Sequence, residues 1–142
     1  YPSEAAERRI LLESVGTEDP VESLEPVLSP GEVLALQSKV EDVHADPSLV
    51  DYLMRIVRAT REDTRLRMGA SPRSSVGLFR AARAFALVNG RDFLVPDDIQ
   101  TMIVPCLAHR LLPASAAAST AEAHDDAAAL LDSLLSDIPV PV

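Results

Sequence analysis

At 142 residues the chain is long enough for one domain with extensions, and apolar residues, 47% of the total, supply a hydrophobic core. No apolar run approaches the roughly 20 residues needed to cross a bilayer, and the first residues do not resemble a signal peptide. Cys106 is the only cysteine, which excludes an internal disulfide and suits a reducing compartment. We therefore expect a cytoplasmic protein without a membrane span.

The formal net charge of −9 argues against general binding to nucleic acid or to an anionic membrane. The average hides a basic segment, because residues 55–91 hold nine arginines and only two acidic residues. Guanidinium groups suit bidentate contacts with carboxylate and phosphate. The segment predicts either an anion-binding surface or a solvated basic face that pairs with the acidic flanks.

The first predicted element is a helix over residues 3–15, in which Ala6, Ile10 and Leu11 face inward and Gly16 is the stop. Residues 17–28 are acidic, contain two prolines and predict an ordered connector. We treat residues 1–27 together as a connecting unit.

Four further helices are predicted, each opened by a proline at the first helical position, where its missing N–H has no partner. Their starts are Ser29-Pro30, Asp46-Pro47, Ser71-Pro72 and Val95-Pro96. Ser29 and Glu32 have the spacing of a capping box. Asn89-Gly90 is a stop signal for the third helix. Pro105 predicts a kink or a restart in the fourth.

Apolar residues recur at three- and four-residue spacing in these helices. They are Val33, Leu36, Val40 and Val43; Leu49, Leu53, Ile56 and Val57; Leu78, Phe79, Ala82, Phe85 and Ala86; and Ile99 and Ile103. The pattern predicts an all-α protein, a compact bundle of about four helices over residues 28–112 with flanking N-terminal and C-terminal helices. Residues 65–68 and 93–95 predict short extended segments.

Residues 113–142 begin with an Ala/Ser stretch, typical of a flexible linker, and end in an amphipathic helix. Its apolar stripe is Ala127, Leu130, Leu131, Leu134, Leu135 and Ile138. Such a stripe has to be covered, either by the bundle or by a partner protein. We favour the helix folding back onto the bundle.

Motifs for nucleotide hydrolysis are missing from this chain. The five glycines are scattered, and the single lysine, Lys39, lies inside a predicted helix, so there is no phosphate-binding loop. Cys106 and His109 have the spacing of half a zinc site, but zinc needs about four ligands, so a buried structural cysteine and a histidine near a helix end explain them better. We interpret Asp97-Asp98 and Asp125-Asp126 as helix caps. No catalytic or metal-binding residue is predicted.

Arg73 is the residue whose position in the sequence suggests a binding role. It lies in the first turn of the helix that begins at Ser71, where unpaired backbone N–H groups favour an anion. A positive charge there opposes the helix dipole slightly, and a bound phosphate would reverse that effect. Arg80 returns to nearly the same stripe, flanked by the small residues Gly77 and Ala84. The pattern fits an anion-reading interface, and a solvated helix face remains open.

Several separated motifs together resemble the lid of MoxR-type AAA+ ATPases, and the resemblance covers residues 1–112. They are Leu24-Glu-Pro-Val-Leu-Ser, Val57-Arg-Ala-Thr-Arg, Gly69-Ala-Ser-Pro-Arg-Ser with Leu78-Phe-Arg-Ala-Ala-Arg-Ala, Gly90-Arg-Asp-Phe-Leu-Val-Pro-Asp-Asp-Ile and Leu107-Ala-His-Arg-Leu. The opening Tyr1-Pro2-Ser3-Glu4 is similar to the stretch after the last strand of the ATPase core.

The resemblance implies an AAA+ lid bundle at residues 28–112, with residues 1–27 leading from the core. Arg73 matches the family's sensor-2 arginine, which contacts the γ-phosphate of ATP, and Ser71 and Ser74 are weaker nucleotide-binding candidates. ATP and Mg²⁺ are implied for the full-length protein, and neither is expected to bind this fragment tightly. The Walker motifs, magnesium ligands, first sensor and arginine finger belong to the core. We therefore expect this C-terminal portion alone to be inactive.

The resemblance also implies partners: the core of the same polypeptide, neighbouring ring subunits, and in some cases von Willebrand A domain proteins and client enzymes of a chaperone or maturation machine. No nucleic acid or membrane partner is expected. Two other hypotheses remain, a nucleic-acid-binding helical module that uses residues 55–91 and an interaction domain whose leucine-rich tail recruits a partner. The sequence does not assign the client protein, the ring stoichiometry, or the roles of Arg58, Arg61, Arg80 and Arg83.

Overall fold

The computed structural model describes residues 1–13, 20–115 and 119–141. This part divides into two units, Tyr1–Val33 and Leu34–Val142. The first holds α1 (Glu4–Glu13), the 3₁₀ turn η1 (Pro20–Ser23) and the start of α2 (Pro30–Lys39). No helix in the described ranges combines the length and apolar character that a membrane span requires.

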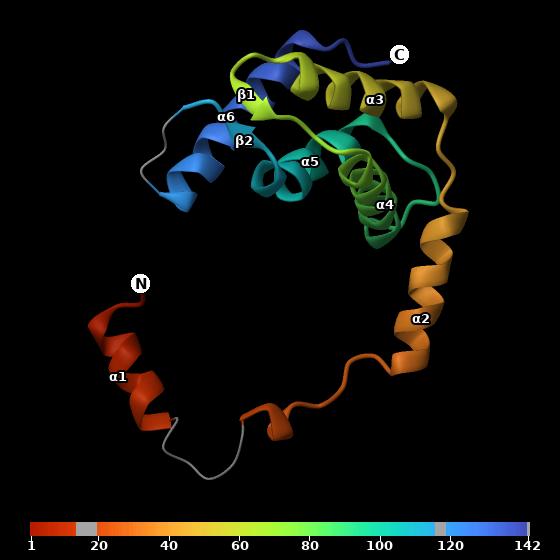
Figure 1. Cartoon of the computed structure of the whole chain (residues 1–142). Helices are drawn as coiled ribbons and strands as arrows, with labels where there is room; N and C mark the ends of the chain where they lie inside the picture. The colour runs from red at the N-terminus through yellow and green to blue at the C-terminus, as the bar shows by residue number, and fades with distance from the viewer. Residues whose placement is uncertain (14–19, 116–118, 142) are drawn as a thin grey trace. The chain divides into compact units, whose positions relative to one another are not determined.

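The second unit is the helical bundle (Figure 1). After α2 come η2 (Val40–Asp42), α3 (Pro47–Glu62), β1 (Leu66–Met68), α4 (Pro72–Val88), α5 (Pro96–Leu107), η3 (Ala108–Arg110), β2 (Leu112–Pro113) and α6 (Thr120–Asp137). Helix α4 packs against α5, and α6 packs against α3, α5, η3 and β2. The prediction of an all-α protein is confirmed.

The predicted helix starts are confirmed by their caps. Ser29 and Glu32 bond reciprocally, with Glu32 Oε2 accepting from the Ser29 backbone N–H at 2.7 Å. The Asp46 carboxylate accepts from the Ser48 N–H at 2.8 Å, which opens α3. Gly90, with φ of +75°, follows the end of α4 as predicted. These contacts span at most four residues, so the local sequence determines where each helix begins.

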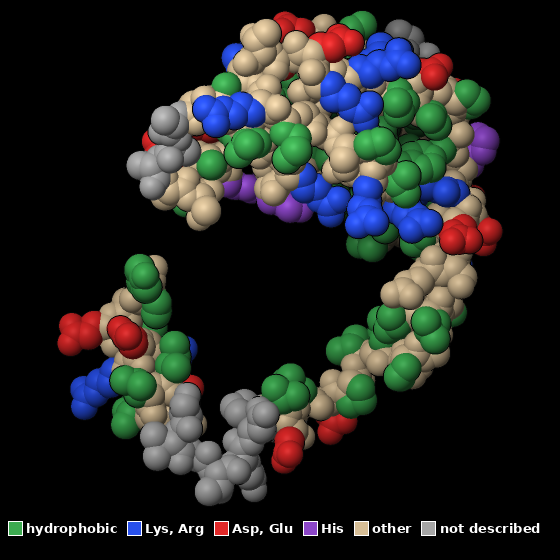
Figure 2. All heavy atoms as spheres, viewed as in Figure 1, with side chains coloured by type: hydrophobic (Ala, Val, Ile, Leu, Met, Phe, Trp, Pro, Cys, Tyr) green, Lys and Arg blue, Asp and Glu red, His purple; other side chains and the backbone are tan. Residues whose placement is uncertain are grey.

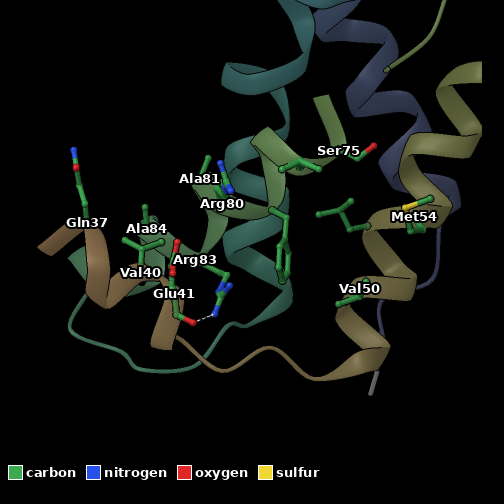
Figure 3. Close-up of a pocket in the computed structure, with 13 residues that line it drawn as sticks. Gln37, Val40, Glu41, Val50, Met54, Ser75, Arg80, Ala81, Arg83 and Ala84 are labelled. Atoms are coloured by element: carbon green, nitrogen blue, oxygen red, sulfur yellow. Dashed lines mark hydrogen bonds between the residues drawn. The ribbon is translucent and has the colours of Figure 1, made fainter. Parts of the chain in front are cut away.

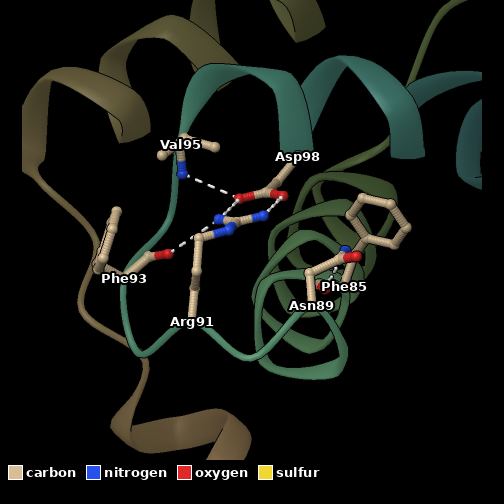
Figure 4. Close-up of polar contacts among 6 residues, drawn as sticks. All are labelled: Phe85, Asn89, Arg91, Phe93, Val95 and Asp98. Atoms are coloured by element: carbon tan, nitrogen blue, oxygen red, sulfur yellow. Dashed lines mark hydrogen bonds and ion pairs between the residues drawn. The ribbon is translucent and has the colours of Figure 1, made fainter.

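Asp98 caps α5 from within its first turn. Its Oδ2 accepts from the Val95 N–H at 2.9 Å, and both of its oxygens accept from Arg91, at 2.7 and 2.5 Å (Figure 4). Burial by itself raises the pKa of Asp98, but the hydrogen bonds from Arg91 and Val95 bring that pKa below its ordinary value. The predicted cap is confirmed, whereas the ion pair with Arg91 was not predicted. The cap interpretation of Asp125-Asp126 is wrong, because Ser119 caps α6.

Three predicted core faces fit the structure and two do not. Leu49, Leu53, Ile56 and Val57 of α3, Leu78, Ala82 and Ala86 of α4, and Ile99 and Ile103 of α5 are all buried. The predicted face that begins in α2 fits only at its end: Val33 is 39% and Leu36 is 43% exposed and no residue of α2 is buried, whereas Val43, which follows η2, is buried in the core. In α1, Ile10 and Leu11 are also exposed, and the predicted stop at Gly16 lies outside the described residues. Phe85 is only half-buried and does not join the core.

Helix α6, unlike α2, contributes residues to the core. Ala127 and Leu131 are fully buried, and Leu130, Leu135 and Ile138 pack against the core. The helix therefore folds back onto the bundle, as we favoured. The start of the predicted linker is held to the bundle, because Pro113 is buried and the Ala114 N–H donates to the Arg65 carbonyl at 2.8 Å, while residues 116–118 lie outside the described residues.

Two short extended segments were predicted, and each pairs with another segment of the backbone. β1 pairs antiparallel with β2, with Leu66 opposite Pro113 and Met68 opposite Leu112. Phe93 forms an isolated parallel bridge with His44. Of the kink or restart predicted at Pro105, the restart is wrong, because α5 continues to Leu107 and the Ala108 N–H still donates to the Val104 carbonyl, while the kink stays a prediction. A proline this close to a helix end removes few hydrogen bonds.

Candidate functional site

The segment that leads into α4 passes in direct contact with the end of α3. A Cβ at Gly69 would lie 2.4 Å from the Thr60 carbonyl oxygen and 2.7 Å from the Arg61 Cα. Both are backbone atoms, so no side-chain rotation relieves such a contact. Glycine is therefore required here for the close approach of two backbones, and this approach positions the start of α4.

Two side chains of α3 hold the next residue, Ala70. The buried Thr60 hydroxyl accepts from the Ala70 N–H at 3.0 Å and donates to the Val57 carbonyl at 2.7 Å. Arg61 Nε donates to the Ala70 carbonyl at 2.7 Å. Because both backbone groups of Ala70 are bonded, the loop has little freedom to move relative to α3. Arg61, whose role the sequence left open, has a structural role.

Ser71 and Ser74 form the cap of α4. The Ser74 N–H donates to Ser71 Oγ at 3.2 Å, and the two hydroxyl oxygens are 3.0 Å apart and hydrogen-bonded. Pro72 occupies the first helical position. Ser74 is buried, whereas Ser71 is exposed. The two hydroxyl groups are thus bonded to each other, and that of Ser71 also accepts from the backbone, which orients the helix start on which Arg73 lies.

Arg73 projects outward from the first turn of α4. It is exposed, and no carboxylate in the described part of the chain pairs with it. It lines a depression of about 440 Å³ together with Met68, Gly69, Ser71, Ser74 and Arg110, which we call the Arg73 depression. An arginine buried inward or paired with an acid would have argued against phosphate sensing, and Arg73 is neither.

Arg110 is the residue of this site that sequence reasoning missed. It ends η3, and its Nη1 lies 3.8 Å from the point where a Cβ at Gly77 would be. Its Nε donates to Nε2 of His109 at 3.0 Å. The sequence held a signal, since Arg110 belongs to the family-like motif at residues 107–111, but nothing local connects it to Arg73.

Other arginines of the basic segment serve the fold. Arg83 donates to the backbone carbonyls of Glu41 and Val43, and its guanidinium lies 5.3 Å from the centre of the Phe79 ring. These contacts join η2 to α4. Arg58 and Arg80, in contrast, are exposed. Lys and Arg side chains gather on the face of the second unit that Figure 2 shows.

A larger groove lies elsewhere on the bundle. It has a volume of about 900 Å³ and runs between α3 and α4, with Val50, Met54 and Phe79 among its apolar lining and Arg80 and Arg83 at its side (Figure 3). Its lining does not include Arg73. The lining is mainly apolar, and its acidic residue and its hydroxyl, Glu41 and Ser75, are not hydrogen-bonded to each other. Because the Arg73 depression instead brings two arginines together without an acidic residue, it is the better candidate site for an anion.

Cys106 and His109 do not form a metal centre with other residues in the described ranges, where no three His, Cys, Asp or Glu side chains gather. Cys106 is half-buried, and burial raises the pKa of its thiol, an effect that the nearby Arg110 partly offsets. The thiol is therefore a poor nucleophile and a poor metal ligand at neutral pH. His109 accepts its hydrogen bond from Arg110.

Comparisons with known proteins agree with the fold and with the resemblance. A family model described as the AAA lid domain matches residues 58–130. The uncharacterised protein YeaC of Bacillus subtilis is 42% identical over 93 residues, which cover 66% of this chain and 29% of YeaC. Chaperone MoxR1 of Mycobacterium tuberculosis is 40% identical over 121 residues, which cover 79% of this chain and 31% of MoxR1.

A solved structure supports the same fold. The crystal structure of an ATPase candidate from Cytophaga hutchinsonii superposes with a TM-score of 0.76 at 23% identity, covering 100% of this chain and 44% of that one. The family model spans half of the chain, and the chain therefore belongs to the AAA lid domain family. Within it, this is a lid portion of the MoxR type of AAA+ ATPase. The chain spans less than a third of the length of the two curated relatives.

Proposed function

We propose that this lid closes over ATP bound to an AAA+ core and that Arg73 contacts the γ-phosphate. The observation that carries the proposal is the outward, unpaired guanidinium of Arg73 at the capped start of α4. A rigidly held donor aimed at developing negative charge stabilises a transferring phosphoryl group without reorganising. The contacts of Gly69 and Ala70 with Thr60 and Arg61 hold the backbone from which the Arg73 side chain projects.

The chemistry of the depression fits a phosphate and does not fit a metal ion. Its charged lining residues are Arg73 and Arg110, and no acidic residue is among them in the described chain. Magnesium needs oxygen ligands, so the Mg²⁺ that accompanies ATP would be held by the core and not by this lid. ATP bound to the core supplies the phosphoryl group. The role of this lid is to orient a positive charge toward that group and to exclude water when it closes.

We further propose a place in a cytoplasmic, ring-forming chaperone or maturation machine. This proposal is supported by the similarity to a relative that is named a chaperone, Chaperone MoxR1, to which this chain is 40% identical over 121 residues. Neighbouring ring subunits, von Willebrand A domain proteins and client enzymes are the partners we expect. The chain itself would contribute nucleotide sensing, and the other activities would reside in the core and in those partners.

The test uses the complete ATPase that carries this lid. We expect Arg73→Ala to lower ATP turnover by about a hundredfold or more, the effect of removing one preorganised donor from a transition state. Assembly should persist, since Arg73 has no partner in the described bundle. The matched control is Arg58→Ala. Arg58 is an exposed arginine of the same basic segment, and it lines neither the Arg73 depression nor the groove between α3 and α4.

Two results would contradict the proposal. Turnover in Arg73→Ala equal to that of Arg58→Ala would remove the sensing role of Arg73. ATP hydrolysis by the purified 142-residue chain would show that the catalytic groups do not reside in a separate core.

A further inference from the structure

We infer that Arg110 is a second phosphate-contacting arginine of the Arg73 depression and makes the lid discriminate ATP from ADP. The inference rests on the proposed function, since it concerns the same site. Arg110 comes from η3 and Arg73 from α4, yet both line this one depression. Two guanidinium groups contributed by separate elements can approach one phosphate from different directions.

The fold brings Arg110 to this position through tertiary pairing. Ala108 and Leu111 on either side of it are buried, which anchors the backbone of η3. The β1–β2 pairing then sets Leu112 opposite Met68, which lies directly before the loop that opens α4. Arg110 is therefore held beside the start of α4 by the core and by the small sheet, and not by its own side chain.

The side chain of Arg110 has its outer nitrogens available. Nε donates to His109, whereas Nη1 and Nη2 have no hydrogen-bond or ion-pair partner in the described part of the chain. On α4, Gly77 lies one turn beyond Arg73, and Nη1 lies 3.8 Å from the point where a Cβ at Gly77 would be, so the Arg110 guanidinium lies beside this turn of α4. A free planar fork of N–H donors suits the bidentate recognition of a phosphate.

The charge balance of the depression points to a multiply charged anion. Arg73 and Arg110 repel one another, and no carboxylate in the described lining offsets them. A terminal phosphate with its high charge density relieves this repulsion and pairs with both groups. ADP lacks the γ-phosphate, so the second arginine adds more to ATP binding than to ADP binding.

The experiment measures dissociation constants of fluorescent ATP and ADP analogues with the complete ATPase. We expect Arg110→Ala to reduce the preference for ATP over ADP by about tenfold or more, the usual contribution of one charge-assisted hydrogen bond. Arg110→Lys, which keeps the charge and loses the fork, should fall between the wild type and Arg110→Ala. Arg73→Ala is the reference for the proposed site, and Arg58→Ala is the control for the general effect of losing an arginine.

The outcomes separate the two proposals. If Arg73→Ala lowers the preference and Arg110→Ala does not, the inference about Arg110 is overturned and the proposed function stands. If neither lowers it, both fail. An equal loss in Arg58→Ala also overturns the inference, because it would indicate bulk electrostatics. Should Arg110→Ala not fold, as judged by circular dichroism, Arg110→Lys decides, and a nucleotide preference equal to that of the wild type then counts against the inference.

Discussion

Replacing Gly69 with alanine tests whether the loop before α4 is held by backbone contact with α3. The new Cβ would lie 2.4 Å from the carbonyl oxygen and 2.6 Å from the carbonyl carbon of Thr60. Carbon atoms in contact prefer about 3.5–4.0 Å. The loop therefore has to move by about an ångström, and this motion strains the hydrogen bond from the Ala70 N–H to the buried Thr60 hydroxyl.

The expected cost combines two effects. Overpacking a well-packed site costs about 1–3 kcal/mol, and weakening a buried hydrogen bond adds about 1 kcal/mol. We expect Gly69→Ala to lower the free energy of unfolding by about 2–4 kcal/mol, and the melting temperature by roughly 10 °C or more in a unit of this size. Urea and thermal denaturation of the chain, followed by circular dichroism, measure both quantities.

The same substitution at Gly77 is the matched control. There the nearest atom, Arg110 Nη1, is 3.8 Å from the new Cβ, an ordinary contact distance. Alanine is preferred over glycine inside a helix, so Gly77→Ala should be neutral or more stable by about 0.5–1 kcal/mol. If Gly69→Ala unfolds at the same urea concentration as the wild type, the close approach to α3 does not hold the loop, and the account of how Arg73 is positioned is wrong.

Two further predictions concern the core. Asp98→Asn should cost about 1–3 kcal/mol at neutral pH, because it removes the negative partner of the partly exposed Arg91. Burial raises the pKa of Asp98, but its hydrogen bonds lower that pKa overall in the folded state. The stabilisation from ionised Asp98 is therefore fully present above the pKa of the unfolded state and disappears as the pH falls through the lower pKa of the folded state. The variant should therefore lose less stability than the wild type between about pH 5 and pH 2, and equal losses in urea titrations would contradict the ion pair. Leu131→Ala, at a fully buried position of α6, should cost about 2–5 kcal/mol, whereas Leu12→Ala at an exposed position should change stability by less than about 0.5 kcal/mol. Similar urea midpoints for these two variants would show that α6 is not part of the core.

Local chemistry made much of the fold predictable. The caps at Ser29, Asp46 and Ser71 involve residues two or three positions apart, so each can be recognised without knowing the rest of the structure. The same holds for the outward position of Arg73, which follows from its lying on the side of α4 opposite the buried Leu78 and Ala82. Its contact with a γ-phosphate stays a prediction.

Apolar spacing was a weaker guide to burial. It shows which residues share a helix face, but whether another element covers that face depends on the rest of the chain. Val33 and Leu36 have the correct spacing and remain exposed, while Ala127 and Leu131 of α6 are buried. Phe85, predicted to lie in the core, is half-buried outside it.

By itself the sequence determined the starts of α2, α3, α4 and α5, the all-α class and the exposure of Arg73, because helix starts and periodic faces are encoded within a few consecutive residues. Only the tertiary structure decided that Arg110 joins Arg73, and that Arg83 joins η2 to α4. Those relations depend on which distant segments pair and pack, as β2 does with β1. Such pairing depends on the packing of the whole core, and no short stretch of sequence contains it.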